Sequence, residues 1–177
     1  IKMYSFTNNK INLTLCGMMG SGKSLVGKLL AKKIDFEFID TDQIIEKKTG
    51  KSIDKIFEEN GEEYFRNLEE KLIIDILDKK KYVISLGGGS ILNNKIRNTI
   101  KDKSYNIYLK VSIDILKQRL ENSKNRPLIK NKDIKKELMS IIKKREKYYK
   151  NCDLIIKNET NINNVIQNIC NRLKIYD

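Results

Sequence analysis

The chain has 177 residues, of which 40% are hydrophobic and 33% are charged, as is typical of one globular domain with a sizeable core. It has no apolar run long enough to cross a bilayer, and its first residues do not resemble a signal peptide, so we expect a cytoplasmic protein with no membrane partner. Three scattered cysteines and the lack of histidine exclude a disulfide framework, a zinc cluster, the usual neutral-pH general base and most transition-metal sites.

The net charge of +13 would by itself suggest a nucleic-acid partner. The basic residues are spread along the whole chain, however, and the run at residues 79–81 falls where a helix is expected to end, which favours positive charge. We therefore expect no nucleic-acid partner. A chain this rich in lysine is expected to keep arginine where a flat, forked donor is required. Its six arginines are Arg66, Arg97, Arg119, Arg126, Arg145 and Arg172.

The first predicted elements are a strand at residues 12–16 and a helix at residues 23–33, joined by a glycine-rich loop at residues 17–24. The loop reads Gly-Met-Met-Gly-Ser-Gly-Lys-Ser and fits the phosphate-binding pattern of a glycine, four residues, a glycine, a lysine and a serine or threonine. Its glycines let N–H groups turn inward around a phosphate, and the following helix adds its positive end. The alternative is a glycine-rich turn with a chance lysine, which the strand-to-helix setting disfavours.

This loop predicts a site for ATP and Mg²⁺. Lys23 can reach the outer phosphates, and the Ser24 hydroxyl is placed to bind Mg²⁺. We predict that ATP is bound here by Gly20, Ser21, Gly22, Lys23, Ser24 and Leu25. In the helix itself, Leu25, Val26, Leu29 and Leu30 are expected to face the core.

A second strand is predicted at residues 36–40, and it leads into the sequence Asp40-Thr41-Asp42. Asp40, at the strand end beside the loop, is the candidate outer-shell holder of Mg²⁺. Asp42 lies past the strand end, where it can point at a second substrate. Because the chain has no histidine, this carboxylate is the best candidate to accept or orient the proton of an attacking hydroxyl. The alternative for Asp42 is that it only caps the following helix.

Helical stretches are expected between the second and third strands. One closes near Gly50, a short one follows, and after a break at Gly61 a long amphipathic helix runs from residue 62 to about residue 79. Arg66 and Glu69 are three residues apart on the long helix, so Glu69 can hold the guanidinium group in place. The alternative is an ordinary solvated charge at Arg66.

The third and fourth strands are predicted at residues 82–86 and 105–111. The third is followed at once by a triple-glycine loop, Gly87, Gly88 and Gly89, and then by a helical stretch through residue 101. Such glycines would let a substrate lie directly against backbone N–H groups, although a plain strand-to-helix turn explains the triplet equally well.

After the fourth strand we predict a helix, a loop at about residues 121–132, a helix at 133–150, a fifth strand near 154–156 and a final helix over 162–173. Arg126, beside the only proline, suits a lid that closes over the transferring phosphoryl group, so it joins Lys23 and Asp42 as a predicted catalytic residue. Arg145 is either a solvated charge or a second arginine at the acceptor pocket. Two arginines there would imply an acceptor with its own anion, such as a carboxylate.

Strands that alternate with helices predict an α/β fold of three layers, in which a parallel sheet lies between helices. In such a sheet the ligand crevice lies at the carboxyl ends of the strands. The glycine-rich loop, Asp40 and Asp42, and the triple-glycine loop each follow a strand, so we expect them to meet there. We expect a single domain over residues 1–177, with residues 1–10 as a flexible or added N-terminus.

Together these motifs resemble the shikimate kinase family, part of the nucleoside-monophosphate-kinase-like P-loop group, over nearly the whole chain. Besides the glycine-rich loop, the resemblance rests on Asp40-Thr-Asp42, Gly61-Glu-x-x-Phe-Arg66 with Glu69, Gly87-Gly-Gly89, Arg126-Pro-Leu128, and Arg145 followed by Tyr148-Tyr149. It implies a P-loop kinase fold with five parallel strands in the order 2-3-1-4-5. It also implies Mg²⁺-assisted phosphorylation of the 3-hydroxyl of shikimate by ATP, a step of aromatic amino-acid biosynthesis.

By this resemblance, Arg66 and Arg145 would grip the carboxylate of shikimate and Asp42 would hold its hydroxyls. Arg126 would reach ATP from the lid, and Arg119 would stack on adenine. The implied shikimate-binding residues are Asp42, Arg66, Glu69, Gly87, Gly88, Gly89 and Arg145.

One region departs from the family pattern. Near residues 158–162 many members have a basic residue or a proline against the adenine, and this chain has neither. Two other functions stay open, namely another small-molecule P-loop kinase, gluconate-like or nucleotide-directed, and a nucleotide-binding protein without turnover. We expect the protein to be a monomer.

Overall fold

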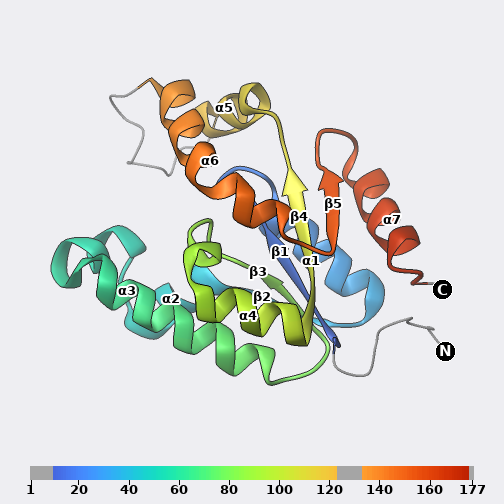
Figure 1. Cartoon of the computed structure of the whole chain (residues 1–177), viewed down its shortest axis with the longest axis horizontal. Coiled ribbons are helices and arrows are strands. Elements are labelled where there is room, and N and C mark those ends of the chain that lie inside the picture. The colour runs from blue at the N-terminus through green and yellow to red at the C-terminus, as the bar shows by residue number, and fades with distance from the viewer. Residues whose placement is uncertain (1–9, 123–132, 176–177) are drawn as a thin grey trace.

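The computed structural model describes residues 10–122 and 133–175, which form alternating strands and helices (Figure 1). All five predicted strands are present, and their bounds differ from the expected ones by at most one residue. The strands are β1 (Asn12–Cys16), β2 (Glu37–Asp40), β3 (Tyr82–Ser85), β4 (Ser104–Lys110) and β5 (Leu154–Lys157). The helices are α1 (Lys23–Ile34), α2 (Thr41–Thr49), α3 (Ile53–Leu77), the 3-10 helix η1 (Ser90–Leu92), α4 (Asn94–Lys103), α5 (Ile113–Glu121), α6 (Ile134–Lys150) and α7 (Ile162–Arg172).

The strands form one parallel sheet in the order β2-β3-β1-β4-β5, which confirms the predicted order. The central strand is β1, in which Leu13 pairs with Val83 of β3 on one side and with Tyr105 of β4 on the other. Because the strands run in the same direction, the segments that follow β1, β2 and β3 leave the sheet at one edge.

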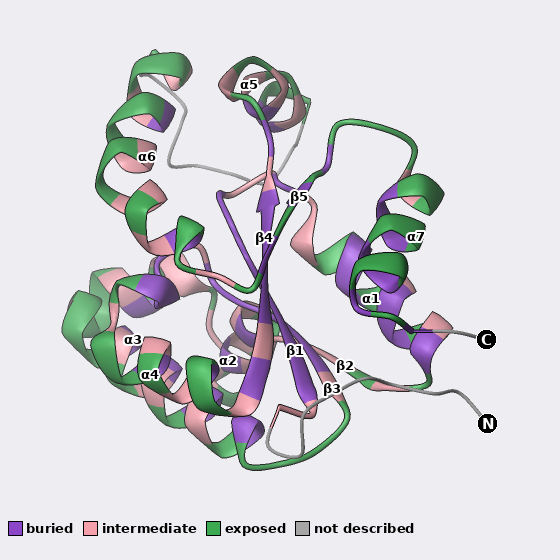
Figure 2. Cartoon of the chain, turned by 45° about the vertical axis from the view of Figure 1, so that its right-hand side comes forward, coloured by how far each residue is buried: buried purple, intermediate pink, exposed green. Residues whose placement is uncertain are grey.

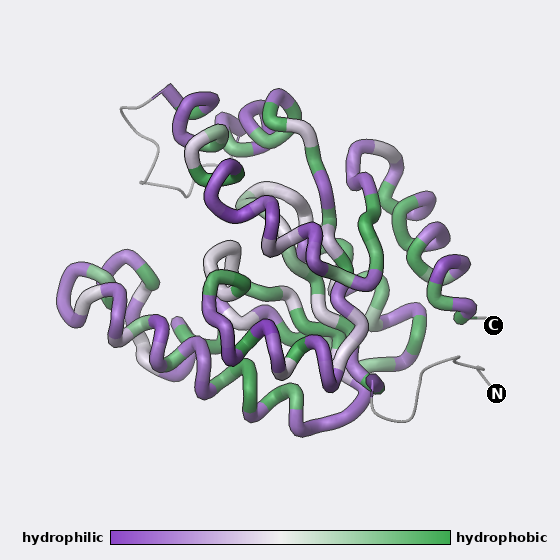
Figure 3. Tube along the Cα trace, viewed as in Figure 1, coloured by the Kyte–Doolittle hydropathy of each residue, from purple (hydrophilic) through white to green (hydrophobic). Residues whose placement is uncertain are grey.

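Two hydrophobic layers hold helices on opposite faces of the sheet. Leu13 and Leu15, both fully buried, pack with α1 and α7 on one face. Cys16 and Ile84 belong to the layer on the other face, which includes α2, α3, α4 and α6. Figure 2 shows the buried strands between these layers, and Figure 3 shows hydrophobic residues alternating with hydrophilic ones along the helices. The predicted three-layer α/β/α arrangement is confirmed.

Helix α1 contradicts one expectation, because Leu25 is 58% exposed and does not face the core. The helix begins at Lys23, and its buried residues recur mainly at spacings of three and four. Leu25 lies outside that stripe and therefore points away from the sheet. The buried residues of α1 are Val26, Gly27, Leu30, Ala31 and Ile34.

In two places the helices are divided differently from the prediction. The break at Gly61 is a kink within α3, where this glycine has φ 82° and ψ 168°, angles that other residues rarely adopt. The stretch after the triple-glycine loop is interrupted instead: η1 comes first, and Asn93 then caps α4 by accepting a hydrogen bond from the Ile96 N–H.

Parts of two other predictions lie outside the described residues. These are residues 1–9 of the N-terminal segment and residues 123–132 of the predicted lid loop, while α5 continues to Glu121. Among the helices in the described part of the chain, none is long and apolar enough to cross a membrane.

A buried asparagine links the amino end of β1 to the end of α3 and the start of β3 by hydrogen bonds. Asn12 in β1 is fully buried, and its Nδ2 donates hydrogen bonds to the Leu77 and Lys79 carbonyl oxygens at 3.3 and 2.7 Å. Its Oδ1 accepts a hydrogen bond from the Tyr82 N–H at 3.0 Å. One side chain therefore satisfies backbone groups at the end of α3 and at the start of β3.

Asn12→Ala would leave these backbone groups without their partner, so we expect it to lower the free energy of unfolding by about 2–4 kcal/mol. Urea unfolding followed by circular dichroism measures the change. Asn164→Ala, at an exposed position of α7, is the control and should change the free energy by less than about 0.5 kcal/mol. Equal effects of the two substitutions would contradict the role given to Asn12.

Candidate active site

The glycine-rich loop (residues 17–24) joins β1 to α1 at the carboxyl edge of the sheet. Gly17 has φ 144°, and a Cβ at this position would lie 2.7 Å from the Leu109 carbonyl oxygen. Gly22, with φ 86°, is the N-cap of α1. Both positions therefore require glycine, and the loop presents the free N–H groups at the start of α1 to a phosphate.

Lys23, Ser24 and Asp40 lie close together beside this loop. The Nζ of Lys23 donates to the Gly17 and Met18 carbonyl oxygens at 3.0 Å each. The Oγ of Ser24 donates to Oδ2 of Asp40 at 2.5 Å. Hydroxyl and carboxylate oxygens suit Mg²⁺, which usually takes one or two protein ligands and completes its shell with water and phosphate oxygens. The two residues predicted to hold the metal therefore fit it.

Two residues brace the outer side of the glycine-rich loop. The Nδ2 of Asn158 donates to the Ser21 carbonyl oxygen at 2.7 Å. Arg119 donates to the carbonyl oxygens of Asn158 at 2.8 Å and of Gly20 at 3.3 Å. Because a peptide group is planar, holding the Ser21 carbonyl also fixes the direction of the Gly22 N–H. Asn158 was not predicted from the sequence, and its partner lies 137 residues away along the chain.

Asp42 is not the cap of α2, because Asp40 has that role through a hydrogen bond of 3.3 Å from the Gln43 N–H to its Oδ1. Capping therefore does not account for Asp42, which lies in the first turn of α2. Burial, together with the negative charges of Glu69 and Asp40, raises the pKa of Asp42 to about 6. A carboxylate with a pKa close to the working pH is suited to act as a general base.

The residues predicted for the acceptor line one crevice of about 750 Å³ next to the glycine-rich loop. This crevice lies at the carboxyl edge of the sheet, and α2, α3, the triple-glycine loop and α6 contribute to its walls. Among its lining residues are Lys23, Ser24, Asp40, Asp42, Arg66, Glu69, Gly87, Gly88, Gly89 and Arg145. Predicted residues from five separate parts of the chain thus meet in one place.

Arg66 is held by two glutamates of its own helix. Its Nη1 donates to Oε2 of Glu69 at 2.8 Å, and its Nε and Nη2 donate to Oε1 of Glu62 at 3.2 and 3.1 Å. Glu69 is fully buried, and its Oε1 accepts a hydrogen bond of 2.5 Å from the Ser90 hydroxyl. The contact with Glu69 was predicted. The contact with Glu62 was not, although its spacing of four residues from Arg66 could have indicated it.

The triple-glycine loop (residues 87–89) approaches these side chains closely. A Cβ at Gly87 would lie 2.6 Å from Oε1 of Glu69 and 2.7 Å from Oδ1 of Asp42. A Cβ at Gly89 would lie 2.6 Å from Nη2 of Arg66. The two outer positions therefore have no room for a side chain, which argues against a plain turn.

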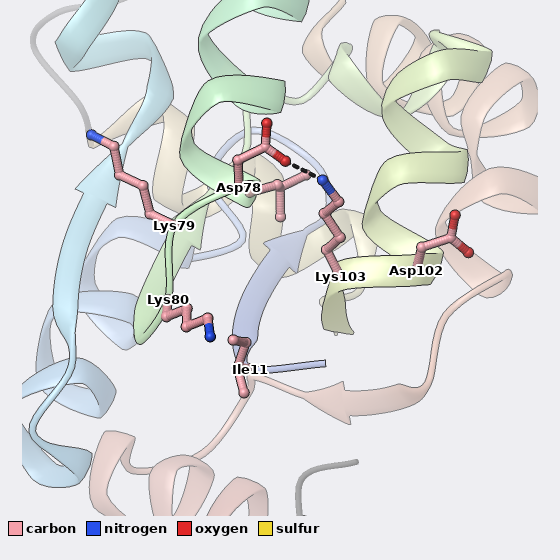
Figure 4. Close-up of a pocket in the computed structure, with 7 residues that line it drawn as sticks. Ile11, Asp78, Lys79, Lys80, Asp102 and Lys103 are labelled. Atoms are coloured by element: carbon pink, nitrogen blue, oxygen red, sulfur yellow. Dashed lines mark hydrogen bonds and ion pairs between the residues drawn. The ribbon is translucent and has the colours of Figure 1, made fainter. Parts of the chain in front are cut away.

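A second cavity, of about 360 Å³, lies at the amino end of the sheet (Figure 4). Lys103 forms an ion pair there with Asp78. None of the predicted site residues that the structure describes lines this cavity, so the crevice at the carboxyl edge is the candidate active site. The residues that line the second cavity are Ile11, Leu77, Asp78, Lys79, Lys80, Asp102 and Lys103.

The sequence of the chain matches one family model along most of its length. The model described as shikimate kinase covers residues 19–174. The chain belongs to the shikimate kinase family. The shikimate kinase of Persephonella marina is 42% identical over 148 residues, which cover 84% of this chain and 89% of that protein. The shikimate kinase of Chlorobium limicola is 42% identical over 153 residues, 82% of this chain and 77% of that protein.

Solved structures of shikimate kinases share the fold. The enzyme from Bacteroides thetaiotaomicron has a TM-score of 0.88 at 28% identity and covers 93% of this chain and 98% of its own. The enzyme from Acinetobacter baumannii, solved in complex with shikimate, has a TM-score of 0.85 at 33% identity and covers 90% of each chain. A gluconokinase from Sinorhizobium meliloti has a TM-score of 0.61 at 15% identity, which shows the P-loop kinase fold alone.

The lack of room for a side chain at Gly89 leads to a prediction about acceptor binding. Gly89→Ala would push the Arg66 guanidinium out of place, so we expect the KM for the acceptor to rise about tenfold or more while the KM for ATP changes little. Steady-state kinetics measure both KM values, and the KM for ATP is the internal control. An unchanged KM for the acceptor, or an equal rise of the two KM values, would argue against the steric explanation.

Proposed function

We propose that the chain transfers the γ-phosphoryl group of ATP to the 3-hydroxyl of shikimate. The observation that carries this proposal is the crevice at the carboxyl edge, in which two arginines, Asp42 and the triple-glycine loop lie next to the glycine-rich loop. Membership of the family supports it, because the curated relatives described above are named shikimate kinase and one related structure was solved in complex with shikimate.

The carboxylate of shikimate would lie against Arg66 and Arg145. A guanidinium group has five N–H donors, and Glu62 and Glu69 occupy three of those of Arg66. One N–H on each terminal nitrogen is left to donate to the carboxylate. Gly87, Gly88, Gly89 and Glu69 would complete the acceptor site, with Asp42 at the shikimate hydroxyls.

Phosphoryl transfer would then depend mainly on position and charge. As the 3-hydroxyl oxygen bonds to the γ-phosphorus, its proton passes to Asp42, and the bond from that phosphorus to the bridging oxygen of ADP breaks. Lys23 and the N–H groups at the start of α1 would stabilise the charge on the transferring group. The rate of phosphoryl transfer would come from holding the two reactants in line, without a covalent intermediate on the enzyme.

Ser24 at the start of α1 and Asp40 at the end of β2 would hold Mg²⁺ beside the phosphates, since both offer oxygen ligands and lie within hydrogen-bond distance of each other. When bound, Mg²⁺ neutralises charge on the phosphate oxygens. Gly20, Ser21, Gly22 and the exposed Leu25 would complete the nucleotide site. Adenine stacking by Arg119 stays a prediction, and the lid residue Arg126 lies outside the described residues. The single domain, monomeric state, cytoplasmic location and lack of a nucleic-acid partner also stay predictions.

ADP release with ATP and Mg²⁺ tests the reaction. In a coupled assay with shikimate, gluconate, a nucleoside monophosphate or no acceptor, we expect release that depends on shikimate alone. Lys23→Ala should reduce ADP release by at least about a hundredfold without lowering the melting temperature. The reason is that the transferring phosphoryl group loses the positive charge that stabilises it. Release with another acceptor, or an active Lys23→Ala variant, would refute the proposal.

The raised pKa of Asp42 predicts the pH dependence. Below a pKa of about 6 the carboxyl is protonated and cannot accept the hydroxyl proton, so kcat/KM for shikimate should fall about tenfold per pH unit there and be level above. Initial rates from pH 4.5 to 8 measure the profile. The residual rate of Asp42→Asn should lack this acidic limb, and a limb that persists in this variant would assign the base to another group.

A further inference from the structure

A tyrosine to which neither the sequence analysis nor the proposed mechanism gives a role joins α6 to the triple-glycine loop. Tyr149 is fully buried and lies one helical turn after Arg145. Its hydroxyl donates a hydrogen bond of 2.6 Å to the Gly88 carbonyl oxygen. This bond connects the helix that carries one predicted carboxylate-binding arginine to the loop that packs against the other.

The Tyr149 ring is held firmly in place. It stacks on the Tyr108 ring of β4, with ring centroids 5.2 Å apart and planes 23° apart. The hydroxyl also lies 3.9 Å from the Met18 sulfur, next to the glycine-rich loop. Burial raises the pKa of Tyr149 to about 12, although the charge of Arg145 opposes the rise. The hydroxyl therefore keeps its proton and remains a donor at any pH at which the enzyme would work.

A second contact joins the same two parts of the molecule. Arg97 of α4 donates to the Ile91 and Leu92 carbonyl oxygens of η1 at 2.9 and 2.7 Å. Its guanidinium carbon lies 4.5 Å from the centre of the Tyr148 ring on α6, a cation–π contact. Of two adjacent tyrosines of α6, Tyr149 thus contacts the triple-glycine loop directly, and Tyr148 contacts Arg97, which holds the turn that follows this loop.

The hydrogen bond of Tyr149 also sets the direction of a donor. The Gly88 carbonyl and the Gly89 N–H belong to one planar trans peptide group and point in opposite directions. A carbonyl held by Tyr149 therefore fixes this N–H, and with it the Gly89 backbone on which the Arg66 guanidinium packs.

We propose that the Tyr149 hydroxyl is a positioning group for the acceptor site. It holds Arg145 and the Gly88–Gly89 peptide group in place relative to Arg66. The inference rests on the proposed function, since it assigns a role within the same site. Tyr149 touches neither reactant and acts through its neighbours. Its loss should therefore affect the acceptor more than the nucleotide.

Tyr149→Phe tests this inference, because it removes the hydroxyl and keeps the stacked ring. We expect the KM for shikimate to rise about tenfold, as for one lost buried hydrogen bond, while the KM for ATP changes less than about twofold. Tyr108→Phe is the matched control, because it removes a hydroxyl from the other ring of the same stack. It should leave both KM values within about twofold of the wild type.

A double-mutant cycle separates positioning from general stability. If Tyr149 acts through Arg145, the effects of Tyr149→Phe and Arg145→Lys on the KM for shikimate should be clearly less than multiplicative in the double variant. Equal rises of both KM values, an unchanged KM for shikimate, or strictly multiplicative effects would overturn the inference. Melting temperatures and ADP binding confirm that each variant is folded.

A readout without acceptor distinguishes failure of this inference from failure of the proposed function. In ¹⁵N-labelled protein, Tyr149→Phe should shift the amide signals of Gly88 and Gly89, and Tyr108→Phe should leave them nearly unchanged. Unshifted signals in Tyr149→Phe would overturn the inference whatever the substrate is. Shifted signals in a protein that does not phosphorylate shikimate would support the contact and refute only the proposed function.

Discussion

Parallel pairing along β1 is the constraint on which the rest of the structure depends. β1 is buried along its whole length and pairs with β3 and β4. Two parallel neighbours cannot be joined by a tight hairpin. Each connection therefore returns along one face of the sheet and usually contains a helix, which covers that face. The same geometry sends the segments after β1, β2 and β3 out at one edge. The active-site crevice therefore follows from the direction of the strands.

The buried carboxylate of Glu69 holds together the part of the crevice proposed to bind the acceptor. Glu69 is fully buried, and an isolated carboxylate in such a place would be strongly destabilising. Arg66 and Ser90 both donate hydrogen bonds to it, so the charge holds α3 against the segment that follows the triple-glycine loop. It also contributes to the raised pKa of Asp42. The direction of an arginine, the place of a loop and the proton affinity of the candidate base are therefore linked.

The sequence predicted what depends on local pattern and missed what depends on distant partners. The strands, the phosphate loop and the Arg66–Glu69 contact follow from periodicity, glycine spacing and helical geometry. It left capping of α2 open as the role of Asp42 and did not identify Asp40 as the cap, because that depends on where the first turn begins. The hydrogen bonds of Asn158 and Tyr149 were not indicated by the sequence, since they span 137 and 61 residues of chain and exist only once the sheet has formed.

The two glutamates around Arg66 bear on which hydroxyl of a polyhydroxylated acid would react. They occupy three of the five N–H donors of the guanidinium, so a bound carboxylate can approach only from the directions that the other two donors leave open. An unsaturated ring conjugated with that carboxylate would favour its plane and would resist rotation about the bond between them. The regiochemistry of phosphorylation would then be decided at the carboxylate, on the far side of the substrate from the bond that forms.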